Sequence, residues 1–184
     1  HILLITNEWK EQNGWIDIKD WEAIKEVNKD TTGLWFFNSG PLAGASQPHR
    51  HIQLLRRDPS ELSCPREKWI LDFDNVNYKN QRFYKNIILK KFSKTLNKEN
   101  IHEIYKVLSY KLGLGKPEID KKPRYPYNLI FTNHWMALIK RKTDNLYGIS
   151  VNALGFAGYI LVTEKSDINY LKKIGPEKLL ENFL

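Results

Sequence analysis

The stretch from Trp35 to Leu55 constrains this chain more than any other part of its sequence. An apolar, aromatic run at 34–37 is typical of a buried strand, and it stops at the Asn-Ser-Gly-Pro of positions 38–41. The loop that follows carries the small residues Gly44 and Ala45. Backbone N–H groups can approach an anion closely in a loop with so few side chains. We therefore expect a strand, a loop suited to phosphate, and a second strand.

The second strand carries a row of polar side chains. Because strand side chains alternate between faces, His49, His51 and Gln53 share one face, while Arg50 and Ile52 share the other. Two imidazoles and a carboxamide would then line one wall beside the loop. His51 is the candidate nucleophile, since neutral imidazole attacks phosphorus and is largely unprotonated near neutral pH. One ring nitrogen must be free to attack while the other donates, most simply to a backbone carbonyl.

This H-x-H-x-Q row resembles the histidine triad superfamily, with Gln53 in place of the third histidine, as in the transferase branch of that superfamily. The longer string N-S-G-P-L-A-G-A-S-Q-P-H-R-H-I-Q-L-L is similar to one family in particular, the diadenosine tetraphosphate phosphorylases, also called ATP adenylyltransferases. Galactose-1-phosphate uridylyltransferase shares only the short row. The resemblance implies an α+β, histidine triad-like fold with a mostly antiparallel sheet flanked by helices.

The resemblance also implies a nucleotidyltransferase that cleaves diadenosine tetraphosphate with inorganic phosphate to ATP and ADP. His51 would attack the α-phosphate, expel ATP and hold AMP until phosphate arrives. Gln53 can donate an N–H to a phosphate oxygen but cannot shuttle a proton. His49 would position the strand or contact the phosphate, with a purely local hydrogen-bonding role as the alternative. Loop N–H groups and the Ser46 hydroxyl would stabilise charge. The expected nucleotide- and phosphate-binding residues are Asn38, Gly44, Ala45, Ser46, Gln47, Gln53, Asn152, Ala153 and Leu154.

The second half of the sequence echoes the first. Residues 3–9 resemble residues 129–135, and the spacing from Asn38 to Gly44 recurs from Asn152 to Gly158. Two degenerate half-units would explain both likenesses, and chance similarity in an apolar, asparagine-rich chain is the alternative. The loop that starts at Asn152 also resembles a family stretch that reaches the bound nucleotide. Just beyond it, Tyr159 and Thr163 replace a methionine and a lysine of the family, which puts a lysine contact from that segment in doubt.

The chain of 184 residues, 41% of them hydrophobic, is long enough for one sizeable domain. We expect a single histidine triad-like domain over residues 1–184 that lacks an N-terminal portion, because residues 1–6 read as a strand already under way. Its predicted parts are a catalytic strand-loop-strand unit (1–58), a helical insert (80–115) and a C-terminal half with a second nucleotide-contacting loop (127–184).

Local patterns predict the remaining elements. Asp20 is the expected N-cap of a short helix in which Trp21, Ile24 and Val27 recur at helical spacing. Residues 56–80 read mainly as loop. Apolar periodicity predicts helices over 80–92 and 98–112, strands at 127–132, 135–140, 147–151 and 159–163, and helices over 166–173 and from Pro176 onward.

Charge and cysteine usage bound the partners. A net charge of +8 suits a polyanionic substrate, although lysines on solvated helix faces account for much of it. The expected partners are a dinucleoside polyphosphate, ATP, ADP and inorganic phosphate, with no dedicated nucleic acid and no membrane. The single cysteine, Cys64, cannot form an internal disulfide, so a reducing compartment, most simply the cytoplasm, fits best.

The sequence shows no metal-ligand pattern, so no obligatory cofactor is expected. Mg²⁺ could still enter the site bound to the polyphosphate substrate. Uridylyltransferases of the superfamily often show zinc-binding cysteines that this chain lacks, which counts against a sugar substrate. Two other readings stay open: a non-catalytic nucleotide- or RNA-binding module, and a hexose-1-phosphate uridylyltransferase-like enzyme. His102 and His134 are expected at the surface, and Lys140 and Arg141 could reach phosphates from a strand end.

Overall fold

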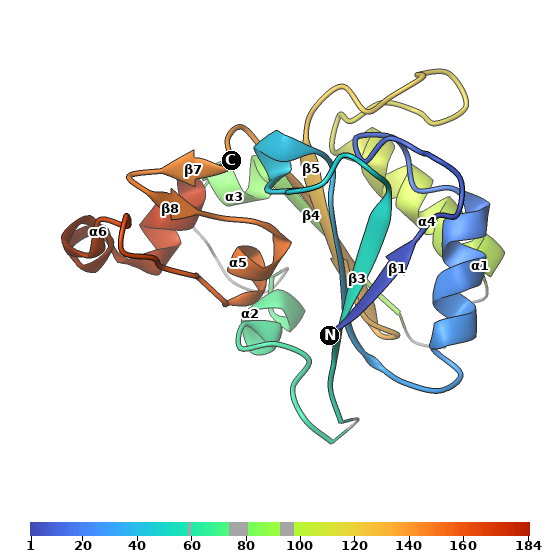
Figure 1. The fold of residues 1–184 in the computed structure, drawn as a ribbon, viewed down its shortest axis with the longest axis horizontal. Coiled ribbons are helices and arrows are strands. Elements are labelled where there is room, and N and C mark those ends of the chain that lie inside the picture. Colours follow the sequence, from blue (N-terminus) through green and yellow to red (C-terminus); the bar gives the residue numbers. More distant parts are fainter. Residues whose placement is uncertain (59, 74–80, 93–97) are drawn as a thin grey trace.

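A computed structural model of the chain describes residues 1–58, 60–73, 81–92 and 98–184. Its centre is a six-stranded sheet in the order β1-β3-β2-β5-β6-β4, in which every neighbouring pair is antiparallel (Figure 1). The strands are β1 (Ile2–Ile5), β2 (Gly33–Asn38), β3 (His51–Arg56), β4 (Ile87–Lys91), β5 (Tyr127–Phe131) and β6 (Trp135–Lys140). A separate ribbon consists of β7 (Asn145–Leu146) and β8 (Ile149–Ser150).

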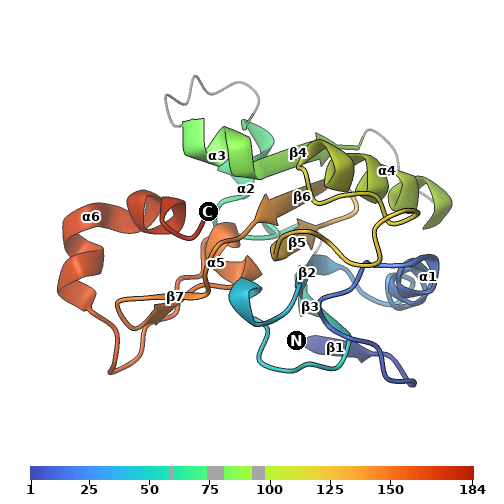
Figure 2. The same cartoon turned by 90° about the horizontal axis from the view of Figure 1, so that it is seen from above.

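Helices cover both faces of the sheet (Figure 2). Helices α1 (Ile18–Val27) and α4 (Lys98–Lys111) lie on one face. The other face carries α2 (Glu67–Leu71), α3 (Gln81–Asn86), α5 (Ala153–Ala157) and α6 (Ile168–Glu181). A short 3₁₀ turn, η1 (Pro41–Ala43), follows β2. None of the helices in the described ranges is long and apolar enough to cross a membrane.

Strand β2 shows why the sheet is covered twice. Leu34 and Phe36 pack into the core beneath α5 and α6, whereas Trp35 and Phe37 pack into the core beneath α1 and α4. Side chains of a strand alternate between faces, so an unbroken apolar run requires cover on both sides. The expected α+β fold with a mostly antiparallel, helix-flanked sheet is confirmed.

The helix predicted over 80–92 is wrong in its second half. Helix α3 ends at Asn86, and Ile87–Lys91 forms the edge strand β4, paired with β6. Ile87 and Leu89 pack into one core while Ile88 packs into the other, which is the period of a strand. The other half of the insert is helical, as α4. Residues 59 and 74–80 of the loop predicted over 56–80 lie outside the described residues, and α2 interrupts the rest of that loop.

The predicted start of α1 is also corrected. The N-cap is Asp17, whose side chain accepts hydrogen bonds from the N–H groups of Lys19 and Asp20. The Asp20 carboxylate accepts the N–H of Asp17 in return, at 2.9 Å, which completes a capping box. Asp20 is therefore the third residue of the helix.

The C-terminal third contains less strand than predicted. Of the strand expected over 147–151, only Ile149–Ser150 is extended, as β8, and it pairs with β7, which precedes the predicted range. Residues 159–163 form no strand. The two predicted terminal helices form one kinked helix, α6, in which Gly175 has a left-handed φ of 77°.

The two loops of the sequence echo have similar local structures. Asn38 ends β2 and is followed by η1 and by Gly44 with φ 86°, while Asn152 caps α5, which is followed by Gly158 with φ 109°. Each loop is thus an asparagine, a short helical turn and a left-handed glycine. A duplication that produced two half-units stays a prediction.

Candidate active site

An open cavity of about 520 Å³ lies over the start of β3, between β1, the loop after η1 and the residue that caps α5. It is lined by His1, Leu3, Ile5, Asn38, Gly44, Ala45, Ser46, Gln47, His49, His51, Gln53 and Asn152. The structure therefore brings together every predicted site residue except Ala153 and Leu154. All of these residues lie within positions 1–53 except Asn152, which the fold brings to the same cavity from about a hundred residues further along the chain.

Strand β3 carries the polar row as the alternation predicted. His51 and Gln53 face the cavity, and Ile52 points into the core on the α1 side. The neighbouring edge strand β1 pairs Ile5 with His51 and Leu3 with Gln53. An apolar wall therefore stands directly beside the polar row.

The His51 ring is held in one tautomer. Its Nδ1 lies 2.8 Å from the backbone oxygen of His49. A carbonyl oxygen can only accept, so Nδ1 carries a proton, and in the neutral ring the lone pair is therefore on Nε2. The residue is only 7% exposed, yet it lines the cavity. This is the arrangement expected of a neutral imidazole nucleophile, one nitrogen fixed by a backbone carbonyl and the other left to react.

His49 lines the same cavity but its ring is engaged elsewhere. Its Nε2 lies 3.1 Å from the Thr6 hydroxyl and 3.2 Å from the backbone oxygen of Glu8. The ring stacks on Trp9 at 5.0 Å between centroids. Of the roles considered for His49, this geometry favours positioning the start of β3 against the segment after β1.

The glycine loop presents fewer backbone donors than its sequence predicts. The N–H of Gly44 donates to Pro41 O at 2.7 Å and that of Ala45 donates to Gly40 O at 3.0 Å, so both serve the turn itself. In the part of the chain that the structure describes, the N–H groups of Ser46 and Gln47 have no protein acceptor. Both residues are exposed at the cavity rim. Ser46 and Gln47 are the donors that an anion in the cavity could use.

Asn38 joins the two halves of the site. It is 2% exposed, and its Oδ1 accepts hydrogen bonds from Asn128 Nδ2 at 2.8 Å and from the Ala153 N–H at 2.9 Å. The N–H of Leu154 donates to Asn152 Oδ1 at 2.9 Å. The N–H groups of Ala153 and Leu154 are therefore bonded to protein side chains, and neither is available to a phosphate.

Arg141 does not reach the cavity, contrary to its predicted reach toward phosphate. It is buried and donates to the backbone oxygens of Thr143 at 2.6 Å and Val151 at 2.7 Å, and to Asn128 Oδ1. Burial lowers its pKa to about 9, so it remains a cation at neutral pH. Asn128 and Arg141 together tie β5 to the segment that leads into α5. The sequence signal for Asn128 was a lone amide within the apolar strand Y-N-L-I-F.

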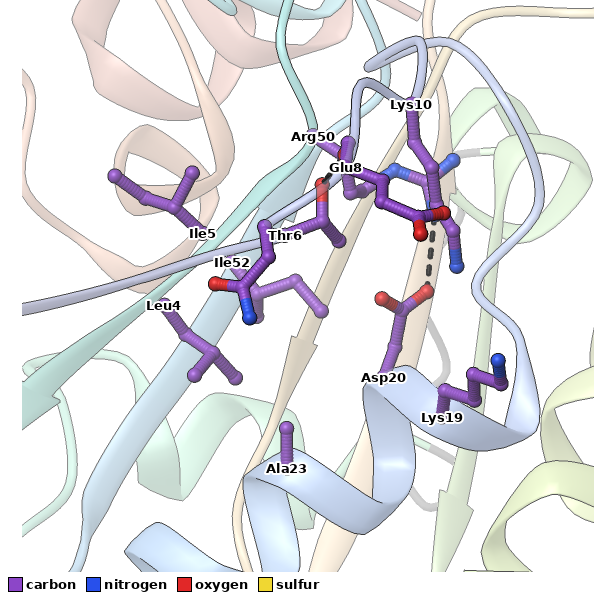
Figure 3. A pocket seen from close by; sticks show the side chains of 11 residues that line it. Leu4, Ile5, Thr6, Glu8, Lys10, Lys19, Asp20, Ala23, Arg50 and Ile52 are labelled. Carbon is purple, nitrogen blue, oxygen red and sulfur yellow. Dashed lines mark hydrogen bonds and ion pairs between the residues drawn. The ribbon is translucent and has the colours of Figure 1, made fainter.

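A second hollow, of about 370 Å³, lies on the opposite face of β1 and β3 (Figure 3). Its polar centre is the buried ion pair between Arg50 and Asp20, at 2.9 Å, drawn as a dashed line. Burial raises the pKa of Asp20 despite the adjacent guanidinium. Leu4, Ala23 and Ile52 supply its apolar lining, and none of the predicted site residues takes part. Arg50 is thus committed to the scaffold, on the far side of the strand that carries His51.

Fold and cavity together define a class: an α+β protein in which a strand-borne histidine, fixed through Nδ1 by a backbone carbonyl, lies beside a glycine loop. Family models specify it further. The ATP adenylyltransferase C-terminal domain matches residues 71–183, and the Ap4A phosphorylase N-terminal domain matches residues 1–70. The chain belongs to the Ap4A phosphorylase (ATP adenylyltransferase) family.

Two curated proteins of Saccharomyces cerevisiae are similar to the chain. Protein APA1 is 23% identical over 206 residues, covering 100% of this chain and 63% of the relative. Diadenosine 5',5'''-P1,P4-tetraphosphate phosphorylase 2 is 22% identical over 201 residues, covering 93% of this chain and 61% of the relative. The chain thus spans less than two thirds of the length of these relatives.

Solved structures of yeast Ap4A phosphorylase Apa2 share the fold. One crystal structure of Apa2 has a TM-score of 0.61 at 18% identity and covers 99% of this chain and 65% of that one. The complex with Ap4A has a TM-score of 0.66 at 18% identity, covering 99% and 67%. The complex with AMP has a TM-score of 0.65 at 19% identity, covering 93% and 63%.

Proposed function

We propose that this chain carries the reacting residues of an enzyme that cleaves diadenosine tetraphosphate with inorganic phosphate, giving ATP and ADP. The observation that carries the proposal is the state of His51: Nδ1 donates to a backbone carbonyl, and the ring lines an open cavity beside exposed loop N–H groups. Family membership and the names of the yeast relatives support the choice of substrate.

The reaction follows from these positions in two displacements. The Nε2 lone pair of His51 attacks the α-phosphorus, a P–N bond forms, the α–β bridging P–O bond breaks, and ATP leaves. An oxygen of inorganic phosphate then attacks the same phosphorus, the P–N bond breaks, and ADP leaves with the imidazole restored. The N–H groups of Ser46 and Gln47 stabilise the charge on the non-bridging oxygens.

Gln53 explains why phosphate rather than water would be the acceptor. Its carboxamide lies one step along the same face of β3 and can donate a hydrogen bond to an oxygen of the adenylate. It cannot take a proton from water, so a water molecule at this position lacks a general base. Dianionic phosphate is a nucleophile without one. Mg²⁺ would enter with the polyphosphate and would offset part of its negative charge.

The test uses the protein that contains this chain, incubated with diadenosine tetraphosphate with and without phosphate. ATP and ADP are expected only with phosphate, and substrate labelled at the α-phosphate should leave AMP on His51. His51→Asn should lose turnover by at least about 10³-fold. His134→Asn, which alters an exposed histidine, is the matched control. Equal turnover by His51→Asn would overturn the proposal, and products without phosphate would indicate a hydrolase.

The alternatives have their own outcomes in the same assay. A non-catalytic nucleotide-binding module would bind the substrate without releasing ATP. A uridylyltransferase-like enzyme would transfer from UDP-glucose, whereas our proposal expects no such transfer. The buried thiol of Cys64 also fits a reducing compartment, and we propose the cytoplasm as the site of action.

A further inference from the structure

Gln12 touches the backbone of the nucleophile directly. It lies between β1 and α1 and is only 2% exposed. Its Oε1 accepts the backbone N–H of His51 at 2.8 Å. Its Nε2 donates to the backbone oxygens of Asn38 at 2.8 Å and of His51 at 3.1 Å. One carboxamide therefore uses both of its ends on the two strands that frame the cavity.

The carboxamide sits where β2 and β3 part. Their pairing ends at Phe36 opposite Gln53, and the same register continued by two residues would place Asn38 opposite His51. At that position the Gln12 side chain is bonded to both residues instead. An amide group offers the same donor and acceptor as a peptide unit, so it can replace the ladder while keeping the strands apart. The cavity opens at this separation.

We propose that Gln12 is a positioning residue for catalysis, which fixes the backbone of His51 so that Nε2 faces the phosphorus. The inference rests on the proposed role of His51 as nucleophile. The other anchor of the ring is the carbonyl of His49, which belongs to the same strand. Ring orientation relative to the glycine loop therefore follows the backbone of residues 49–51. A backbone N–H serves one acceptor, and that of His51 is given to Gln12.

Gln12 can act as a fixed point because its own segment is held to β3. Its backbone N–H donates to Pro48 O, and the N–H of Arg50 donates to Lys10 O, each at 2.8 Å. The Arg50 side chain, on the far face of the strand, donates to Glu11 O at 2.9 Å and holds Asp20 (Figure 3). The segment that carries Gln12 is thus clamped to the strand that carries His51 from both sides.

Replacing Gln12 by glutamate distinguishes a residue that acts through its hydrogen bonds from one that only fills space. An ionised carboxylate at position 12 can accept the His51 N–H. It repels the carbonyl oxygens of Asn38 and His51, to which Gln12 Nε2 donates in the unaltered protein. Only the protonated acid can donate to one of them. Activity of Gln12→Glu relative to the unaltered protein should therefore rise as the pH falls. Gln12→Met, similar in size and without hydrogen bonds, should show a ratio that does not depend on pH.

The test measures kcat and KM for diadenosine tetraphosphate phosphorolysis in the protein that contains this chain. We expect Gln12→Met to lower kcat about 10- to 100-fold with KM changed less than about threefold, because substrate contacts stay in place. Gln12→Asn, one methylene shorter, should fall in the same range. Tyr105→Phe removes the buried hydroxyl bond to Tyr127 (2.7 Å) away from the cavity, and it should leave kcat unchanged at a comparable loss of stability.

Further outcomes separate the two proposals. Inactivity of His51→Asn together with full kcat for folded Gln12→Met would overturn the role of Gln12 and leave the proposed function intact. Turnover by His51→Asn would overturn the proposed function itself. If a variant folds poorly, the pH ratio of Gln12→Glu and the ¹⁵N signals of the His51 ring at neutral pH remain as readouts. A flat ratio together with unaltered His51 signals in Gln12→Glu would also overturn the positioning role.

Discussion

Replacing Gly44 by alanine tests how closely the two loops of the site fit. Gly44 has a left-handed φ of 86°, and a Cβ there would lie 2.7 Å from Asn152 Cβ and 3.1 Å from the backbone oxygen of Val151. Gly113 is a matched control. Its φ is 79°, but a Cβ there meets no described atom within 4 Å. Both variants carry the same backbone strain, and Gly44→Ala alone adds a collision between the loops.

The size of the effect can be worked out from these contacts. A left-handed backbone destabilises the folded state by about 1–2 kcal/mol for an L-residue. The lower conformational entropy of the unfolded chain after Gly→Ala offsets about 0.4–1 kcal/mol of this loss. We therefore expect Gly113→Ala to lose roughly 1 kcal/mol of unfolding free energy. Overpacking adds about 1–3 kcal/mol at Gly44, because the neighbour is partly backbone and cannot turn aside. At about 2–4 °C per kcal/mol, Gly44→Ala should melt about 2–12 °C below Gly113→Ala.

The assay combines thermal unfolding followed by circular dichroism with phosphorolysis of diadenosine tetraphosphate. Gly44→Ala should also lower kcat/KM, since pushing the loop off Asn152 displaces the N–H groups of Ser46 and Gln47. Gly113→Ala should keep full activity. Equal melting temperatures for the two variants would refute the reasoning, because they would show that the loops have room to spare.

Three further predictions concern the scaffold. Burial raises the pKa of the Cys64 thiol to about 11, so a thiol reagent at pH 8 should modify the native protein far more slowly than the urea-unfolded chain; equal rates would contradict this burial. Burial also acts on Asp17, but bonds from Lys10 and the α1 N–H groups hold its pKa below the usual value. Its ionised form therefore stabilises the fold near neutral pH, and this is lost as the pH falls through the lowered pKa. Asp17→Asn should cost about 0.5–1 kcal/mol at pH 7 and less at pH 3 by urea titration; a cost independent of pH would speak against the charge. Arg141→Met should cost about 2–6 kcal/mol, because the buried carbonyl of Val151 and the partly buried carbonyl of Thr143 lose their donor, and an unchanged urea midpoint would show that water replaces it.

Much of the site could be predicted from the sequence because its residues are close in the chain and follow a strand period. Alternation alone places His51 and Gln53 on one face. The buried partners could not be found this way. Gln12 meets His51 across 39 residues, and Arg141 meets Ala43 across 98, so no local pattern contains either pair. Their contacts exist only after the sheet has formed.

Errors in the fold have equally specific causes. Ile87 follows Phe83 by four residues and Phe92 follows Ile88 by four, which is helical spacing. The consecutive apolar residues 87–89 also suit a strand that is covered on both faces, and pairing with β6 decides between the two. The displaced start of α1 had a readable signal, because Asp17 and Asp20 stand in the spacing of a capping box. No sequence signal shows that the N–H groups of Gly44 and Ala45 bond within their own turn, because a tight turn and an open anion-binding loop contain the same small residues.

The carbonyl of His49 has a consequence for the regiochemistry of modification at His51. With Nδ1 occupied, any electrophile that enters the cavity, whether a carbonate reagent, an alkylating probe or the adenylate itself, forms its bond at Nε2. The two N-substituted histidine isomers can be separated after proteolysis. A labelled peptide from the native protein should therefore contain the Nε2 isomer, whereas the unfolded chain would yield both.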